Sequence, residues 1–147
     1  MSFEIDHRLK SDSTLLVKCN HIQIRLIHDS RYPWLILVPE YKDVYDVDDL
    51  DWNVQLQVLQ ISAWVCKALK VAFMPDKLNV AALGNIVKQL HIHHVARFEY
   101  DDTWPGPIWG KGKSLPYSPP DFEKRKGLIC TTLKELNQGD LNAYYYD

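Results

Sequence analysis

The feature that most constrains the fold of this chain is a histidine-rich segment, Leu83–Arg97, which reads LGNIVKQLHIHHVAR. Aliphatic residues surround its three histidines, and this pattern favours a β-strand. Successive side chains of a strand point to opposite faces, so Gln89, His91 and His93 are expected to share one face, with about 6.5–7 Å between neighbours. Two imidazoles and an amide in a row on a rigid element suit the binding of an anionic group.

Three further apolar segments predict the rest of a sheet. Cys19–His28 alternates apolar and polar residues, which is typical of a half-exposed strand. Trp34–Val38 is continuously apolar and is followed by proline, as in a strand that is covered on both faces. These two segments are close enough in sequence to form a hairpin. A second strand pair, Leu78–Leu83 with Ile86–Arg97, is expected around the Gly-Asn turn between them.

One long helix is predicted between the two strand pairs. Its apolar residues recur at spacings of four, three and four, at Val54, Val58, Ile61 and Val65. Neither glycine nor proline interrupts the pattern before Phe73. The acidic run Asp46–Asp51 suits the beginning of this helix, where carboxylates meet the positive end of the helix dipole.

The remaining segments lie near the two ends of the chain. Glu4–Lys10 is expected to form a short helix. Trp104–Pro120 is too rich in proline and glycine for a regular element, and we expect an ordered loop that its tryptophans hold in place. Asp121–Asn137 is expected to form a final helix capped by Asp121, followed by a tyrosine-rich tail.

Length and composition indicate a single globular domain over residues 1–147, with a core at about 19–97 and a C-terminal loop and helix at 104–147. The net charge of -2, without a basic stripe, argues against nucleic-acid binding. The charged N-terminus is unlike a signal peptide, and the longest strongly apolar run, Trp34–Val38, is too short for a membrane span.

The chain has three cysteines, which lie far apart and form no CxxC motif: Cys19, Cys66 and Cys130. An odd and dispersed set fits a reducing compartment better than a disulfide framework. The sequence therefore predicts a soluble cytoplasmic protein, for which we expect no cofactor.

The segment Gly84–Arg97 resembles the signature strand of the histidine-triad (HIT) superfamily, Gly-Gln-x-Val-x-His-φ-His-φ-His-φ-φ, in which φ is apolar and which often ends in Pro-Arg. The upstream order is similar too: a hairpin whose second strand ends in proline, a long helix, and Asn79 shortly before the signature. The resemblance implies an α+β fold with an antiparallel sheet of about five strands, one long helix and a C-terminal helix. It also implies a homodimer.

The resemblance further implies a reaction. The middle histidine of the triad, here His91, would attack the α-phosphorus of a nucleotide and form a nucleotidyl-histidine intermediate. His93 would donate a hydrogen bond to a phosphoryl or leaving-group oxygen. Gln89 replaces the first histidine, and its amide can donate and accept hydrogen bonds but cannot carry a proton. A neutral imidazole is available as a nucleophile at pH 7 because its ordinary pKa is about 6.5.

The same resemblance assigns residues around the substrate, a nucleotide or dinucleoside polyphosphate whose phosphoanhydride or phosphoramidate bond would be cleaved. Asn79 and Asn85 would position its phosphate, close to Gly84, and Asp29 would hold the ribose hydroxyls. His94 is expected to point to the opposite face of the strand from the nucleophile and to take no part.

Three positions depart from the family pattern and leave alternatives open. The first histidine of the triad is a glutamine, Ile86 replaces a serine or threonine, and Trp34 stands where the family has a fourth histidine. These changes favour, as one alternative, a degenerate module that binds nucleotides without turnover. In another alternative, a zinc-dependent hydrolase, His91 and His93 would share a metal whose third ligand is His21, His28 or a distant aspartate.

Overall fold

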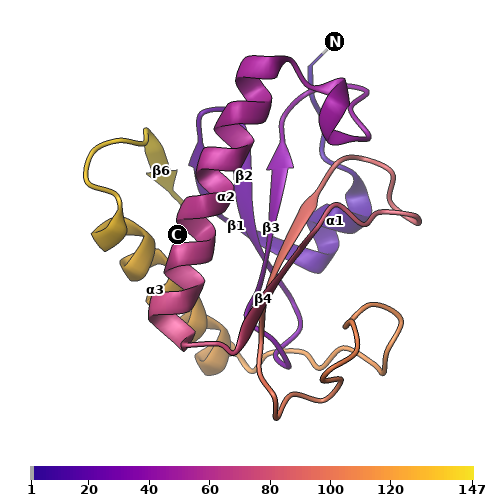
Figure 1. The fold of residues 1–147 in the computed structure, drawn as a ribbon, viewed down its shortest axis with the longest axis vertical. Coiled ribbons are helices and arrows are strands. Elements are labelled where there is room, and N and C mark those ends of the chain that lie inside the picture. The colour runs from indigo at the N-terminus through magenta and orange to yellow at the C-terminus, as the bar shows by residue number, and fades with distance from the viewer. Residues whose placement is uncertain (1) are drawn as a thin grey trace.

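Every pair of neighbouring strands in this chain runs antiparallel. The computed structural model describes residues 2–147, which form a six-stranded sheet of order β4-β5-β3-β2-β1-β6 (Figure 1). The strands are β1 (Ser13–Cys19), β2 (Ile22–Ile27), β3 (Trp34–Pro39), β4 (Lys77–Ala81), β5 (Ile92–Arg97) and β6 (Ala143–Tyr145). The helical elements are α1 (His7–Asp12), the 3-10 turn η1 (Val47–Asp49), α2 (Trp52–Phe73) and α3 (Pro119–Leu136). The predicted α+β class is confirmed, with six strands instead of about five.

The predicted hairpin forms the centre of the sheet. β2 pairs with β3, and β3 also pairs with β5, so β3 has a neighbour on each side. Leu35 and Leu37 belong to the main core beneath α2, whereas Ile36 and Val38 belong to a smaller cluster with Leu9 of α1. The continuously apolar sequence of β3 therefore reflects burial on both faces, as predicted.

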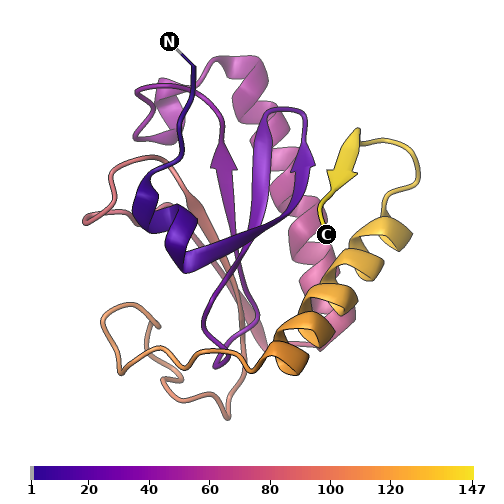
Figure 2. The same ribbon diagram turned by 180° about the vertical axis from the view of Figure 1, so that it is seen from behind.

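The long helix α2 covers one face of the sheet and packs beside α3, while α1 lies on the other face (Figure 2). The indole Nε1 of Trp64 donates to the carbonyl oxygen of Leu133 at 3.0 Å and joins the two helices. The helix begins at Trp52, later than the acidic run, because Asp46 and Asp49 close the separate turn η1 through a capping box.

By length and composition alone, α2 could span a membrane. A search for uninterrupted apolar runs misses it because glutamines and lysines interrupt its sequence. In the fold its apolar stripe, including Val58, Ile61, Val65 and Leu69, is buried against the sheet. The core helix of a soluble protein passes the same test.

Two strands escaped sequence analysis for different reasons. β1 has a bulge between Leu15 and Val17, so the adjacent Leu16 and Val17 are both fully buried. This extra residue breaks the alternation by which strands are recognised. β6 has only three residues in the tyrosine-rich tail and pairs with β1 at the edge of the sheet.

The second predicted strand pair forms, because β4 pairs with β5, but the prediction of a Gly-Asn turn between the two strands is wrong. β4 ends at Ala81 and β5 begins at Ile92, and residues 82–91 form a loop. Two histidine side chains hold this loop by its backbone: His91 bonds the carbonyl of Gln89, and His93 bonds the carbonyl of Leu83. The three predicted triad positions therefore do not share one strand, because two of them precede it.

The helix α1 begins later than predicted, and α3 begins earlier. α1 begins at His7 because the side chain of Asp6 caps it by accepting from the Arg8 amide. α3 begins at Pro119, and its cap is Ser118, whose hydroxyl accepts from the amide of Asp121. The residues between β5 and α3 contain no helix or strand, as predicted for the Trp/Pro-rich loop.

Candidate active site

A cavity of about 730 Å³ lies where the loop 82–91 meets β5, and residues of α1 line it as well. Its walls come from six parts of the chain: α1, the end of β2 with the two residues after it, the start of β3, the loop 82–91, His93 of β5 and the Trp/Pro-rich loop. Apolar side chains line much of it, among them Leu9, Ile27, Trp34 and Val87. An apolar cleft with a few convergent polar groups is the usual form of a small-molecule site.

His91 lies between this cavity and a smaller polar one of about 190 Å³, and it lines both. Its Nδ1 is 2.7 Å from the carbonyl oxygen of Gln89. A carbonyl oxygen only accepts hydrogen bonds, so Nδ1 carries the proton and Nε2 keeps its lone pair. Burial lowers the pKa of His91, and the side chain is therefore neutral at pH 7 and has a nucleophilic nitrogen.

His93 packs edge-on against His91, with 4.8 Å between the ring centroids. Both nitrogens of His93 are bonded within the protein: Trp34 Nε1 donates to Nδ1 at 3.0 Å, and Nε2 lies 2.8 Å from the Leu83 carbonyl oxygen. Burial lowers its pKa to about 4. The neutral ring thus holds the loop in place through its hydrogen bonds. The predicted hydrogen bond from His93 to a substrate oxygen would require one of these bonds to break.

Gln89 directs its side-chain amide toward the start of the chain. Its Oε1 accepts from the amide of Asp6 at 2.9 Å, and its Nε2 donates to the carbonyl oxygen of Glu4 at 2.9 Å. The structure therefore brings His91 and His93 together, while the Gln89 amide is engaged with the N-terminal segment.

The predicted substrate-binding residues fall into two groups. Gly84, Asn85 and Asp29 line the large cavity. The Asp29 carboxylate is already paired with the Arg31 guanidinium at 2.8 Å. Asn79, on β4, does not line the cavity, and its side-chain oxygen accepts from Arg97 Nη1 at 2.8 Å.

No motif in the sequence indicates that the beginning of the chain belongs to this site. Arg8, Leu9 and Asp12 of α1 line the cavity, although they lie about eighty residues before the histidines. Trp109 of the Trp/Pro-rich loop packs on His93, with 5.1 Å between ring centroids. No local pattern predicts such contacts, because they depend on the path of the chain across the sheet.

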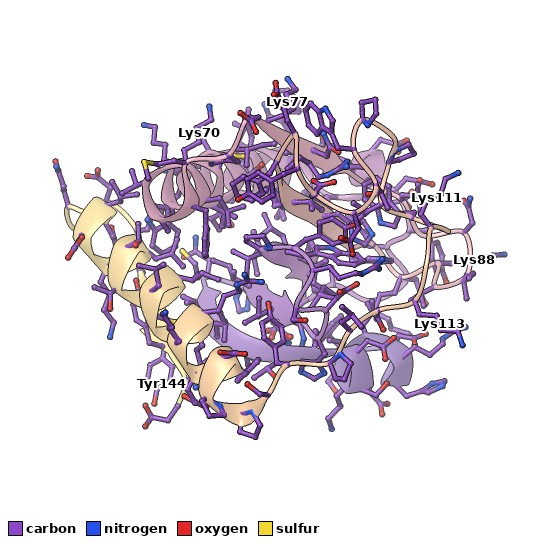
Figure 3. The ribbon with its side chains drawn as sticks, turned by 90° about the horizontal axis from the view of Figure 1, so that it is seen from below. Lys70, Lys77, Lys88, Lys111, Lys113 and Tyr144 are labelled. Atoms are coloured by element: carbon purple, nitrogen blue, oxygen red, sulfur yellow. The ribbon has the colours of Figure 1, made fainter. Side chains whose placement is uncertain are left out.

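Cationic side chains gather on the side of the molecule where the loops lie. Lys88 comes from the loop 82–91, and Lys111 and Lys113 come from the Trp/Pro-rich loop (Figure 3). Lys88 lines the small polar cavity beside His91, and the other two line a separate hollow next to Arg31. This distribution favours an anionic ligand over a cationic one.

Comparison with known proteins agrees with this geometry. The family model of the HIT domain matches residues 8–100, more than half of the chain. This chain belongs to the HIT family. Membership supports a nucleotide-binding hydrolase or transferase kind of function. A search among curated proteins returned no match.

Solved structures of other HIT proteins are similar over nearly the whole chain. A histidine triad protein from Sinorhizobium meliloti 1021, SMc02904, is 39% identical with a TM-score of 0.86, and the match covers 88% of this chain and 96% of that one. The protein blr8122 from Bradyrhizobium japonicum is 34% identical with a TM-score of 0.88, covering 90% and 99% of the two chains. A third, from Marinobacter aquaeolei VT8, has the same identity and TM-score and covers 92% and 99%.

The zinc alternative needs a third ligand beside His91 and His93. Within residues 2–147, no group of three or more histidine, cysteine, aspartate or glutamate side chains is placed to hold a metal ion. His28 instead bonds the hydroxyl of Thr14 at 2.7 Å, and both nitrogens of His93 are engaged. The described residues therefore give this alternative no ligand set.

Gly84 is a position where any side chain would displace His91. A Cβ atom there would lie 2.7 Å from His91 Cε1 and even closer to the Val87 carbonyl oxygen. Gly84→Ala should lower any turnover that depends on His91 by about 10²-fold, since a catalytic group misplaced by roughly 1 Å loses about that much. Steady-state kinetics with the best nucleotide substrate would measure it. Gly127→Ala in α3, where a Cβ meets nothing within 4 Å, is the matched control, and equal kcat values would contradict the prediction.

Stability should fall in mild acid because of two buried histidines. Burial lowers the pKa values of His93 and His94 to about 4, whereas the unfolded chain titrates near its ordinary pKa of about 6.5. Between these values the unfolded state binds more protons, so the free energy of unfolding should decrease as the pH falls from about 6.5 toward 4.

Urea unfolding at pH 7.5, 6 and 5 would measure this loss. His94→Gln is the informative variant, because His94 is fully buried against Ser62 Oγ at 2.7 Å and lies away from the cavity. The variant should show a shallower dependence of the unfolding free energy on pH. An unchanged slope would show that His94 does not cause the effect.

Proposed function

We propose that this HIT protein is a hydrolase or nucleotidyl transferase that cleaves a phosphoanhydride or phosphoramidate bond of a nucleotide, with His91 as the nucleophile. One observation carries the proposal. The Gln89 carbonyl oxygen fixes the proton of His91 on Nδ1, which leaves the Nε2 lone pair free on a side chain that lines two cavities. An imidazole in this tautomer can attack phosphorus without first losing a proton.

The reaction would proceed in two displacements. The lone pair of His91 Nε2 attacks the α-phosphorus, an N–P bond forms, and the bond to the leaving group breaks with its electron pair. The imidazolium keeps its Nδ1 proton, which still donates to the Gln89 carbonyl oxygen and stabilises the positive charge. Water or another acceptor then attacks phosphorus, the N–P bond breaks, its electron pair returns to Nε2, and the acceptor proton passes to solvent.

The two cavities beside His91 divide the substrate in this proposal. The larger one, with Ile27 and Trp34 in its walls, takes the nucleoside, because apolar walls favour a base. The smaller one, with Asn85 and Lys88, takes the leaving group, because an amide and an ammonium group bind phosphate oxygens. Asp29 would contact the ribose at the edge of the larger cavity.

A binding module without turnover is the second candidate, and specific observations favour it. Both nitrogens of His93 and the amide of Gln89 are bonded to other parts of the protein. His93 is therefore not free to protonate a leaving group, and the Gln89 amide cannot supply a proton at all. An enzyme built in this way would prefer leaving groups that depart as stable anions, such as nucleoside polyphosphates.

The decisive experiment incubates the protein with dinucleoside polyphosphates and nucleoside phosphoramidates, with and without a chelator. A nucleotidyl adduct on the peptide that contains His91, trapped by rapid denaturation and detected by mass spectrometry, would support the enzyme. Nucleotide binding by calorimetry without adduct or turnover would support the binding module. Turnover that the chelator abolishes and zinc restores would support the metal alternative.

The proposal includes a homodimer. β4 is an edge strand, and Trp52, Leu56 and Leu59 expose apolar side chains at i, i+4 and i+7 on one side of α2. Such a stripe on a surface helix is typical of an interface. Light scattering should give twice the chain mass for the wild type and the chain mass for Leu59→Lys. Val71→Lys, an exposed apolar position on another side of α2, should stay dimeric, and a monomeric wild type would contradict the pairing.

A further inference from the structure

The first described residues of the chain form an extended segment that crosses the open face of the sheet before α1 begins. We call residues 3–8, which comprise this segment and the first two residues of α1, the N-terminal strap. Phe3 and Ile5 pack against the small apolar cluster of Leu9, Ile36 and Val38, and Val87 of the loop 82–91 packs against the same cluster. The strap therefore lies against both the sheet and the loop 82–91, next to the cavity beside His91.

Gln89 holds this strap in place. Its amide accepts from the main-chain N–H of Asp6 and donates to the main-chain carbonyl of Glu4, each at 2.9 Å. The amide thus satisfies one donor and one acceptor of the strap, as a neighbouring strand would.

The strap brings an arginine to the nucleotide site. Arg8 Nε and Nη2 bind the Asp6 carboxylate at 3.0 and 2.9 Å, which fixes the plane of the guanidinium. Arg8 Nη1 points to the loop 82–91, where it reaches the carbonyl oxygen of Ile86 at 3.3 Å. Among the described residues that line the large cavity, Arg8 is the only lysine or arginine.

We propose that the strap, anchored by Gln89, supplies Arg8 as a phosphate-binding side chain of the nucleotide site. This inference rests on the proposed nucleotide substrate. Gln89 is then a positioning residue, and Arg8 is a specificity residue that selects a phosphorylated ligand over a plain nucleoside. The long contact to the Ile86 carbonyl gives way to a charge-assisted hydrogen bond between Nη1 and a phosphate oxygen, which is the stronger interaction.

Titration calorimetry with AMP, GMP, adenosine and guanosine tests the inference. Arg8→Gln should weaken binding of the preferred monophosphate by at least about tenfold, as expected for one charge-assisted hydrogen bond. Binding of the matching nucleoside should stay within about twofold, because the nucleoside has no phosphate. Lys10→Gln removes an exposed cation from the same helix and should change neither affinity.

Gln89→Ala tests the anchor. It should weaken monophosphate binding about as much as Arg8→Gln, and the double variant should be no weaker than either single one, because both changes remove the same interaction. Amide hydrogen exchange of residues 2–9 should become faster in Gln89→Ala and stay unchanged in Lys10→Gln. An unaltered exchange rate in Gln89→Ala would overturn the anchor.

The outcomes separate this inference from the proposed function. A wild-type protein that binds no nucleotide would overturn the proposed function and the role of Arg8 with it. An Arg8→Gln variant that binds the monophosphate as tightly as the wild-type protein does would overturn the inference alone. Equal losses of nucleoside and monophosphate affinity in Arg8→Gln would also overturn it, because the arginine would then only support the cavity wall.

Discussion

His91→Ala should lower kcat on the order of 10³-fold or more, since the loss of a nucleophile removes the covalent route altogether. Nucleotide affinity should change only a few-fold, because the cavity walls come from other residues. Single-turnover kinetics and calorimetry on the same variant would separate the two effects. The adduct detected by mass spectrometry should also disappear.

His21→Ala is the matched control for this experiment. His21 is exposed in the turn between β1 and β2 and lines neither cavity beside His91. Its removal should leave kcat unchanged. Turnover that survives in His91→Ala would show that another group attacks phosphorus, and the two-step reaction would then be wrong for this chain.

Asp101→Ala should destabilise the fold by about 3–5 kcal/mol, the usual cost of leaving one member of a buried ion pair without its partner. Arg97 and Asp101 form such a pair at 2.8 Å, with side chains only 1% and 3% exposed. Burial alone would raise the pKa of Asp101, but hydrogen bonds from Arg97 and from the amides of Phe98 and Thr103 lower it. The carboxylate is thus charged and fully engaged.

Arg97 also joins three parts of the chain, which adds to the expected loss. It donates to Asn79 on β4, to Asp101 and Thr103 in the following turn, and to the Gly106 carbonyl in the Trp/Pro-rich loop. Urea unfolding would measure the change in free energy. The neighbouring Asp102→Ala removes an exposed carboxylate and should cost little, so similar losses in both variants would contradict a special role for the pair.

The predictable parts of this fold are those where local pattern and tertiary burial agree. The apolar run in β3 and the helical spacing in α2 reflect burial of the same residues in the core. The alternation in β2 identified Ile22, Ile24 and Leu26 as core residues. The prediction of a half-exposed strand is wrong, because Gln23 and Arg25 are buried as well. The strand β1 was not predicted, because its bulge turns two adjacent residues inward. The loop 82–91 was predicted as strand because its aliphatic residues are typical of strands. Its path depends instead on hydrogen bonds from the histidine side chains.

The site divides in the same way. The predicted alternation holds for His93 and His94, which lie on opposite faces of β5. His91 lies beside His93 as expected, although it belongs to the loop 82–91 and not to the strand. The hydrogen-bond partners of Gln89 and Asn79 could not be predicted from the sequence. Gln89 bonds main-chain atoms 83 and 85 residues away, and Asn79 bonds Arg97 across a strand pair. Because every residue has a main-chain carbonyl and nearly every residue a main-chain N–H, the sequence does not show which of them a side chain such as Gln89 binds.

The separation between Gln89 and its main-chain partners has a consequence for biosynthesis. Residues 4–6 leave the ribosome early, but the amide that binds them follows 83 to 85 residues later, just before β5. β5 must also insert between β3 and β4 before the histidines reach their final positions. A nascent chain therefore has no complete pocket until most of the sheet exists, and a fragment that stops before β5 cannot retain partial nucleotide affinity through this site.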